Sequence, residues 1–424
     1  MRIALAVHKL PPESLGGTEI YTWSLARQLA RAGHQVHLFH PQLGKEIGAA
    51  PTQREGVHLW PAPVSSQPGE GPVRQYWHTF RDRAVERSFQ EFLDRTQPQI
   101  VHFQHVQGVS ARLIDLAAPL PRLLTLHDYW FFCANSQLVR PDRSPCTGPS
   151  FACMNCVDCA TDRADLLWLR RLRPLVALPF AYRNRYLRRM VAQIDRFIAP
   201  SHFLRQQYVD QGFPGERISV LENGQDPARL LLRGRQPWPH PPGRPHFAFL
   251  GALAWQKGVH ILVEAFNRLP PEAALTIYGS EPFPDYAAEV KALAHHPRIR
   301  FAGPVPFEQV GDALDQVDAL VVPSLWYENS PLVIQEAYGA GVPVVASRLG
   351  ALTEKVQDGV NGRLFPAGDV EALARLLGEL VAEPSQLAAM AARVTPPPTM
   401  QDHVRALTAI YQELLTASPS RARV

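Results

Sequence analysis

A run of fifteen residues near position 330 carries the most distinctive chemistry in the chain. From Pro323 to Ala337 it reads Pro-Ser-Leu-Trp-Tyr-Glu-Asn-Ser-Pro-Leu-Val-Ile-Gln-Glu-Ala. Ser330 suits the N-cap of a helix and Pro331 suits its first position, so the amides of Leu332 and Val333 are expected to point, unpaired, into a binding site. Free N–H groups at the positive end of a helix dipole are typical of an anion site.

Two glutamates frame this predicted helix start. Glu328 lies in the loop ahead of the helix, and Glu336 lies more than one turn inside it, in an otherwise apolar stretch. A carboxylate in such surroundings is costly unless it accepts hydrogen bonds. Ligand hydroxyl groups, such as those of a ribose, are suitable donors.

A lysine follows an earlier strand in the same half of the chain. Gly251-Ala252-Leu253-Ala254-Trp255-Gln256-Lys257-Gly258 comes directly after the predicted strand 247–250. Lys257 can neutralise a phosphate there as a point charge. The alternative is an ordinary solvated loop lysine.

Weaker signals follow other strands. Gly279 comes directly after a predicted strand, and Val305 follows Gly303-Pro304. Gly16-Gly17 precedes the first helix and permits close approach of backbone to a phosphate or sugar, but the third glycine of a dinucleotide-binding loop is missing, which argues against NAD. His127-Asp128 also follows a strand; the alternatives there are a structural histidine and a turn or cap aspartate.

Short apolar strands alternate with helices along the whole chain, which predicts parallel sheets covered on both faces. The expected strands are 2–7, 35–39, 100–103, 123–126, 197–199, 247–250, 275–278, 299–302, 319–322 and 342–346. The expected helices are 18–32, 259–269, 331–338 and 402–415. The fold class is therefore α/β, with two Rossmann-like doubly wound domains. Because ligands bind beyond the carboxyl ends of parallel strands, we expect a central cleft between them.

A proline-rich stretch separates the two halves. Residues 230–246 include Gln-Pro-Trp-Pro-His-Pro-Pro-Gly-Arg-Pro, which supports neither a helix nor a central strand. We therefore expect an N-terminal domain over 1–229, a linker over 230–246 and a second domain over 247–399. Residues 400–424 are expected to form a helix that crosses back to the first domain.

Composition limits the class of partner. The chain has 424 residues, of which 43 are basic and 39 acidic, for a formal charge of +4. This balance does not indicate a nucleic-acid partner. No apolar run reaches the roughly 18–20 residues of a membrane span, and the first residues do not resemble a signal peptide. The sequence favours a cytosolic protein.

Five cysteines cluster in a loop rich in proline and glycine. They are Cys133, Cys146, Cys153, Cys156 and Cys159. Thiolates at this spacing can share a structural zinc ion or an iron-sulfur cluster. Free thiols and a local disulfide are the alternatives.

A basic and apolar stretch follows the cysteines. Residues 163–189 combine Leu-Leu-Trp-Leu-Arg-Arg-Leu-Arg with a second group of four arginines. Three interpretations stay open: a helix at the inner face of a membrane, a patch that binds an acceptor phosphate, and a solvated basic helix.

The segment Pro323–Ala337 resembles the Glu-x7-Glu signature of family-four retaining glycosyltransferases of the two-domain GT-B fold, and residues 340–347 and 358–362 also match that family's pattern. The resemblance implies transfer of a hexose such as glucose from a nucleotide diphosphate-sugar, UDP-sugar first, without a metal ion or other catalytic cofactor. Ala252 replaces an arginine common in the family, so Lys257 is expected to carry the diphosphate charge alone.

The resemblance also implies site roles. The residues expected to take part in catalysis are His127, Lys257 and Glu328. Glu328 is expected to bind the donor-sugar hydroxyls, and Glu336 is expected to bind the ribose. The expected donor-binding residues are Gly16, Gly17, Gly251, Lys257, Gly279, Val305, Glu328, Asn329, Ser330, Leu332, Val333 and Glu336.

The acceptor stays open between a cell-envelope glycan or lipid-linked sugar and a soluble sugar phosphate, as in sucrose-phosphate synthase-like relatives. A sensor that binds the sugar nucleotide without turnover is the alternative from another class, and Ala252 favours it. Phosphorylase-like chemistry would need a pyridoxal lysine site and a much longer chain.

Overall fold

The computed structural model describes residues 1–11, 16–42, 44, 47–63, 76–226 and 244–417. The chain divides into two compact units, Met1–Glu222 with Met400–Val424, and Asn223–Thr399. Most of the predicted linker lies outside the described residues, and the division between the units falls a few residues before it.

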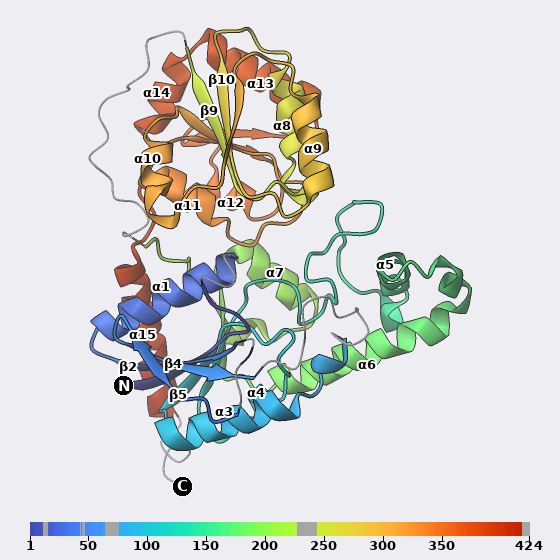
Figure 1. Cartoon of the computed structure of the whole chain (residues 1–424), viewed down its shortest axis with the longest axis vertical. Coiled ribbons are helices and arrows are strands. Elements are labelled where there is room, and N and C mark those ends of the chain that lie inside the picture. Colours follow the sequence, from blue (N-terminus) through green and yellow to red (C-terminus); the bar gives the residue numbers. More distant parts are fainter. Residues whose placement is uncertain (12–15, 43, 45–46, 64–75, 227–243, 418–424) are drawn as a thin grey trace. The chain divides into compact units, whose positions relative to one another are not determined.

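The first unit is built on a sheet of eight strands in the order β3-β4-β2-β1-β5-β6-β7-β8 (Figure 1). Its strands are β1 (Arg2–Ala6), β2 (Gln35–Pro41), β3 (Thr52–Arg54), β4 (Val57–Ala62), β5 (Ile100–Phe103), β6 (Arg122–Thr125), β7 (Arg196–Ala199) and β8 (Ile218–Val220). All neighbouring pairs are parallel except β3 and β4, an antiparallel pair at the edge that the sequence pattern did not predict.

Helices cover this sheet. They are α1 (Gly17–Arg31), α3 (Arg83–Thr96), α4 (Leu113–Leu116), α5 (Cys156–Arg163), α6 (Arg173–Val191), α7 (His202–Asp210) and α15 (Met400–Ala417), with 3-10 turns η1 (Phe151–Cys153), η2 (Leu167–Leu172) and η3 (Gly215–Arg217). Asp82 caps α3 by accepting from the amides of Ala84 and Val85, and Ser201 caps α7 by accepting from the amide of Leu204.

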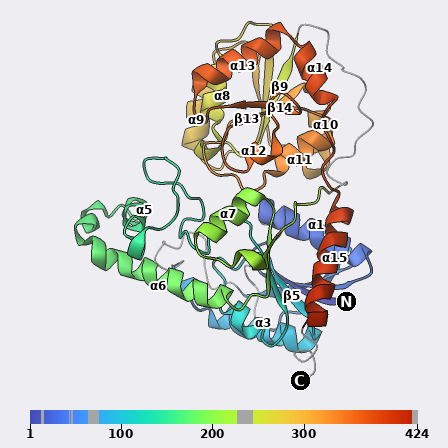
Figure 2. The ribbon, with the colours of Figure 1, turned by 180° about the vertical axis from the view of Figure 1, so that it is seen from behind.

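The C-terminal helix α15 belongs to the first unit, where it lies beside α1 (Figure 2). Leu407, Tyr411 and Leu414 join the apolar core formed by β1 and α1. Two polar contacts fix its position: the Tyr411 hydroxyl lies 2.7 Å from Nδ1 of His102, and Nε2 of His403 lies 2.7 Å from the Tyr21 hydroxyl. The helix is therefore an integral part of this unit's core.

The second unit has a wholly parallel six-stranded sheet in the order β11-β10-β9-β12-β13-β14. Its strands are β9 (His246–Leu250), β10 (Ala274–Tyr278), β11 (Ile299–Gly303), β12 (Ala319–Val322), β13 (Val344–Ser347) and β14 (Gly362–Phe365). Its helices are α8 (Val259–Phe266), α9 (Pro284–Leu293), α10 (Val310–Leu314), α11 (Leu332–Gly339), α12 (Leu352–Lys355), α13 (Val370–Ala382) and α14 (Ser385–Ala391), with turns η5 (Trp255–Lys257) and η6 (Phe307–Gln309).

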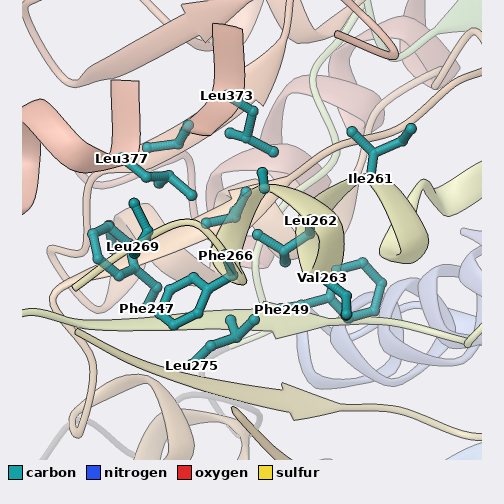
Figure 3. Packing of buried hydrophobic residues seen from close by; sticks show 14 of the residues in the cluster. Phe247, Phe249, Ile261, Leu262, Val263, Phe266, Leu269, Leu275, Leu373 and Leu377 are labelled. Atoms are coloured by element: carbon teal, nitrogen blue, oxygen red, sulfur yellow. The ribbon is translucent and has the colours of Figure 1, made fainter. Parts of the chain in front are cut away.

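Each face of this sheet carries its own apolar core. On one face, Phe266 of α8 packs between Phe247 of β9 and Leu377 of α13 (Figure 3). On the other face, Ile334 and Ala337 of α11 pack against Leu320 of β12. A strand buried on both faces needs apolar side chains at every position, which explains the continuous Ala-Leu-Val-Val of β12.

The buried histidines that hold α15 make stability depend on pH. Burial, with a smaller contribution from His403, lowers the pKa of His102 to about 3, and burial lowers that of His403 to about 4. Both rings are neutral in the folded state, whereas the unfolded chain binds protons below the ordinary value of 6.5. Their stabilising contribution is present above that pH and is lost as the pH falls towards 4.

We therefore expect the first unit to lose about 1 kcal/mol of stability per buried histidine between pH 7 and pH 5.5, measured by calorimetric unfolding. His102→Gln should flatten this pH dependence, because one titrating group is removed. His202→Gln, at an exposed position on α7, should leave it unchanged. A wild-type unfolding temperature independent of pH in this range would contradict the assignment.

Candidate functional site

Four loops gather at one edge of the second unit's sheet, where β9, β10, β11 and β12 end. The amide of Leu325 donates to the carbonyl of Gln256 over 2.9 Å, which joins the loop after β12 to the loop after β9. The Gly251 amide donates to Tyr278 over 3.0 Å, and the Gly279 amide donates to Gly303 over 2.8 Å. Parallel strands deliver the predicted loops to one place.

Glu328 is the centre of this loop cluster. Its Oε1 accepts from Lys257 Nζ at 2.7 Å, Ser324 Oγ at 2.8 Å and Trp326 Nε1 at 2.9 Å. The glutamate is 6% exposed. Three donors on one oxygen fix the carboxylate in orientation, so it is prepared to bind a ligand without rearrangement.

The charge state of Glu328 follows from two opposing effects. Burial by itself raises the pKa of this carboxyl, but the Lys257 ammonium and the three hydrogen bonds outweigh it and leave the pKa below its usual value. Lys257 Nζ also lies 5.5 Å from the centre of the Trp326 ring. The site therefore holds an ionised carboxylate and a cation side by side.

Two glycines allow the loops to approach each other this closely. A Cβ on Gly258, whose φ is +69°, would lie 1.9 Å from the Pro323 carbonyl oxygen, and a Cβ on Gly279 would lie 1.9 Å from that of Gly251. No side chain fits at either place without moving the backbone.

Helix α11 begins one residue later than predicted. Pro331 is its N-cap, with φ −67° and ψ 112°, and Leu332 is its first residue. The prediction that Ser330 caps the helix is wrong, because no side-chain cap bond forms and its buried hydroxyl makes no hydrogen bond within the described residues. The extended ψ of Pro331 is the non-helical backbone conformation of an N-cap residue, so the helix begins after it.

The remaining predicted donor residues of this unit lie on or near the same loops. Glu336 is 3% exposed inside α11. Val305 is half-buried after β11 and packs against the core on the α11 side. Asn329 precedes the helix, and Leu332 and Val333 form its first turn. Sequence reasoning missed Ser324 and Trp326, although both lie within the segment it singled out.

His127 and the glycine pair lie in the first unit. Nε2 of His127 lies 3.0 Å from Oε1 of Gln104, and the ring packs edge-on against Tyr21. Burial, followed by the charge of His105, lowers the pKa of His127 to about 3, so the ring is neutral near pH 7. Gly16 is the N-cap of α1, and Gly17 is its first residue.

Two further histidines join His127 at the carboxyl ends of β1 and β5. His105 Nε2 lies 3.1 Å from Oδ2 of Asp128, and its ring centre lies 4.7 Å from that of His8. Nε2 of His8 in turn lies 3.6 Å from Oε1 of Glu19. Sequence analysis missed His8 and His105, although each lies two residues after the end of a strand, the feature that identified His127.

The five cysteines are all described and form no disulfide. Cys133 donates to Oδ1 of Asn135 over 2.7 Å, and Cys153 accepts from Nδ2 of Asn184 over 3.4 Å. Over the described parts of the chain, no three His, Cys, Asp or Glu side chains are arranged to hold a metal ion. The structural zinc or iron-sulfur cluster at these thiols stays a prediction.

Removing the positive partner of Glu328 should destabilise the second unit. We expect Lys257→Met to lower its free energy of unfolding by about 1–3 kcal/mol, because a buried carboxylate loses its counter-charge. Adding Glu328→Gln should recover part of this loss. The measurement is a double-mutant cycle by urea unfolding.

Lys291→Met is the matched control. Lys291 pairs with Glu281 at 2.6 Å, but both side chains are exposed, so its loss should cost at most about 1 kcal/mol. An equal cost for the two lysine variants would show that the Lys257 pair contributes no more than a surface ion pair.

Known families match both units. Residues 15–229 match the family described as Glycosyltransferase Family 4, and residues 244–383 match that described as Glycosyl transferases group 1. Among curated proteins, the amylovoran biosynthesis glycosyltransferase AmsK of Erwinia amylovora is 30% identical over 48% of this chain and 53% of its own length. The D-inositol 3-phosphate glycosyltransferase of Corynebacterium efficiens is 27% identical over 90% of this chain and 87% of its own.

The chain spans about half the length of the first curated relatives that it matches. Solved structures, in contrast, match nearly the whole chain. Sucrose-phosphate synthase from Thermosynechococcus elongatus superposes with a TM-score of 0.69 at 19% identity, covering 98% of this chain and 99% of that one. Anabaena HepE in complex with UDP and glucose gives 0.63 at 17% identity, covering 98% and 100%. These matches confirm the GT-B fold.

No helix among the described residues has the length and apolar character needed to cross a bilayer. The family match over more than half of the chain and the two sheet units agree with the resemblance stated from the sequence. The chain belongs to glycosyltransferase family 4.

Proposed function

We propose that this protein is a retaining glycosyltransferase that transfers a hexose from a nucleotide diphosphate-sugar to a hydroxyl group of an acceptor. The observation that carries the proposal is the Lys257–Glu328 pair, held at 2.7 Å at the carboxyl edge of the second unit's sheet. An ionised carboxylate suits sugar hydroxyls, and a cation beside it suits phosphate.

Glu328 would bind the donor sugar. All three of its hydrogen bonds go to Oε1, so Oε2 is the atom available to accept from a sugar hydroxyl. Glu336, buried inside α11, would accept from the ribose. Gly251, Gly279 and Val305, on the neighbouring loops, would supply backbone contacts to the nucleotide.

Lys257 and the first turn of α11 would stabilise the diphosphate. Negative charge builds up on the phosphate as the bond to the sugar breaks, so donors fixed in advance lower the barrier. Ala252 offers no charge at the position where relatives often have arginine, which leaves this task to Lys257 and the helix. We propose that transfer needs no metal ion.

The reaction would exchange one bond at the anomeric carbon for another. The bond from C1 to the phosphate oxygen breaks, the acceptor oxygen bonds to C1 on the same face, and the acceptor proton passes to the leaving phosphate. The configuration at C1 is kept. His127, neutral near pH 7, would lie near the donor sugar as a hydrogen-bonding group.

UDP-sugar is our first choice of donor, because HepE was crystallised with UDP-glucose as well as with UDP. Two acceptor classes have support. The likeness to sucrose-phosphate synthase favours a soluble sugar phosphate, and the similarity to a lipopolysaccharide core glycosyltransferase of Rhizobium meliloti, 29% identical over 53% of this chain, favours an envelope glycan. The non-catalytic sensor remains the competing proposal, supported by Ala252.

The test is a panel of nucleotide sugars incubated with the purified protein, with and without EDTA, in which released nucleoside diphosphate is measured. We expect release from one donor, unchanged by EDTA, and a fall of at least about 100-fold in Glu336→Ala, because the ribose would lose its buried carboxylate acceptor. NMR of the product at C1 should show the donor's anomeric configuration.

Glu289→Ala is the control, since Glu289 is an exposed glutamate on α9 in the same unit, and it should keep wild-type release. Tight donor binding without release under every acceptor tried would favour the sensor. Inversion at C1 would refute retention, and loss of activity in EDTA that added Mg²⁺ restores would refute metal independence.

A further inference from the structure

A large cavity lies in the first unit, between α5, α6 and the segments that follow β5 and β6. Its volume is about 1610 Å³. Sites for small ligands usually measure roughly 300–1,000 Å³. The cavity therefore has room for a longer molecule than a single sugar.

Apolar and aromatic side chains make up much of its wall. They include Trp77, Trp130, Leu138, Leu169, Val176 and Phe180. Trp130 and Leu138 are buried, so this part of the wall is fixed by the core. A wall of this kind gains free energy by covering an apolar chain.

Charged groups in the wall are mostly positive. Five cationic side chains line the cavity, compared with two carboxylates, Asp142 and Asp158. Both carboxylates are already engaged, Asp142 with Ser144 and Asp158 with Arg173 and with Arg170, one of the five cations. The cations are Lys9, Arg140, Arg163, Arg170 and Arg183. The surplus of positive charge suits an anionic group on the ligand.

Among these cations, Arg183 gives the strongest indication of an anionic ligand. It is 2% exposed, donates to the Trp130 carbonyl over 2.7 Å and to Asn184 over 3.2 Å, and its guanidinium lies 4.9 Å from the Trp130 ring centre. In the described part of the chain it forms no ion pair with a carboxylate. A buried cation without a counter-ion is costly, so the site favours an anion close to it.

The surface next to the cavity is unusually apolar. Of the twelve large apolar side chains exposed on the described residues, eight lie between positions 151 and 182. We call six of them the apolar stripe: Leu167, Trp168, Leu172, Leu175, Leu178 and Tyr182. Scattered exposed apolar residues are normal, but these six are concentrated on η2 and the N-terminal part of α6, which indicates a contact surface.

The apolar stripe adjoins both the cavity and a group of arginines. Leu178 and Tyr182 line the cavity and are also 62% and 60% exposed, so they mark its opening. Residues 166–194 contain seven arginines and no acidic residue. They run along η2 and α6, the long green helix with α5 beside one end (Figure 1). Four of them, Arg171, Arg185, Arg188 and Arg189, are exposed, and their charge complements an anionic lipid surface. Of the others, Arg183 is buried, and Arg170 and Arg173 pair with Asp158.

From these observations we infer that the cavity binds an amphiphile with a long apolar chain and a phosphate group, and that the apolar stripe receives it from an anionic bilayer. The inference rests on the proposed function, since the amphiphile would be the lipid-linked acceptor. The chain lies against the apolar wall, and the phosphate lies among the cavity's cations. The acceptor class left open by the comparisons is then membrane-derived.

The first test measures binding of three probes to the full chain by intrinsic tryptophan fluorescence, since Trp77 and Trp130 line the cavity. We expect farnesyl phosphate to bind at least about tenfold more tightly than farnesol or inorganic phosphate, because only farnesyl phosphate satisfies both the wall and the cations. Equal affinity for inorganic phosphate alone, or for farnesol, would overturn the inference.

A variant pair gives the matched control. Leu178→Glu, at the exposed opening, should weaken farnesyl phosphate at least about tenfold, because it places a charge on the apolar path. Phe283→Glu alters a similarly exposed side chain, 54% exposed, in the other unit and should have no effect. Equal effects of the two variants would refute the site.

The second test is co-flotation of the protein with vesicles. We expect binding to vesicles with phosphatidylglycerol and little to pure phosphatidylcholine, with a loss of at least about tenfold in Trp168→Glu/Leu175→Glu. Unchanged flotation of that variant would refute the apolar stripe. UDP binding, measured in parallel by calorimetry, separates the two proposals: its absence would undermine the proposed transferase, whereas flotation and probe binding test only the acceptor site.

Discussion

The uniform direction of the strands in the second unit's sheet is the constraint on which the candidate site depends. Because all six strands are parallel, each loop that follows a strand leaves at the same edge. Residues 71 positions apart, Lys257 and Glu328, thereby come within 2.7 Å. The loops can approach this closely only because Gly258 and Gly279 lack side chains. The apolar cores on both faces fix the strands of the sheet, and the strands fix the loops that carry Lys257 and Glu328.

The first unit depends on a helix that is distant in sequence, since α15 completes its apolar core. Helix α15 supplies Tyr411 to His102 across 309 residues, and His403 to Tyr21. These buried polar pairs satisfy one another inside an apolar core, where an unpaired group would be costly. The ends of β5 and β6 are thereby fixed, and with them the histidines that follow these strands.

The two units also differ in the partners of their buried charged side chains. In the second unit, one oxygen of a buried carboxylate accepts three hydrogen bonds, one of them from a lysine that supplies the opposite charge. In the first unit, a buried arginine faces a largely apolar cavity with no carboxylate paired to it in the described residues. In the second unit the carboxylate already has a cationic partner and its Oε2 stays available to a ligand, whereas in the first unit the arginine is suited to an incoming anion. This contrast fits the proposed roles of the second unit in donor binding and of the first unit in acceptor binding.

Local sequence determined much of this protein. Runs of apolar residues placed β5 and β12 at the predicted positions and the other predicted strands within one or two residues, because a strand buried on both faces must be apolar throughout. The loops after those strands, with Lys257 and Glu328, and the helix that carries Glu336 could be identified for the same reason. Strands β3, β4, β8 and β14 escaped prediction. β3, β8 and β14 are short strands at sheet edges, and β4 is only partly buried along most of its length, so none of them has that continuous pattern.

Tertiary structure alone decided which of these residues meet. No spacing indicates that Ser324, Trp326 and Lys257 share one oxygen of Glu328, or that Tyr411 lies against His102, because such contacts depend on strand order and on how the chain returns. The start of α11 at Leu332 was likewise set by the path of the chain into the helix. The cavity beside α6 and its unpaired arginine arise from packing among segments distant in sequence, which local preferences do not encode.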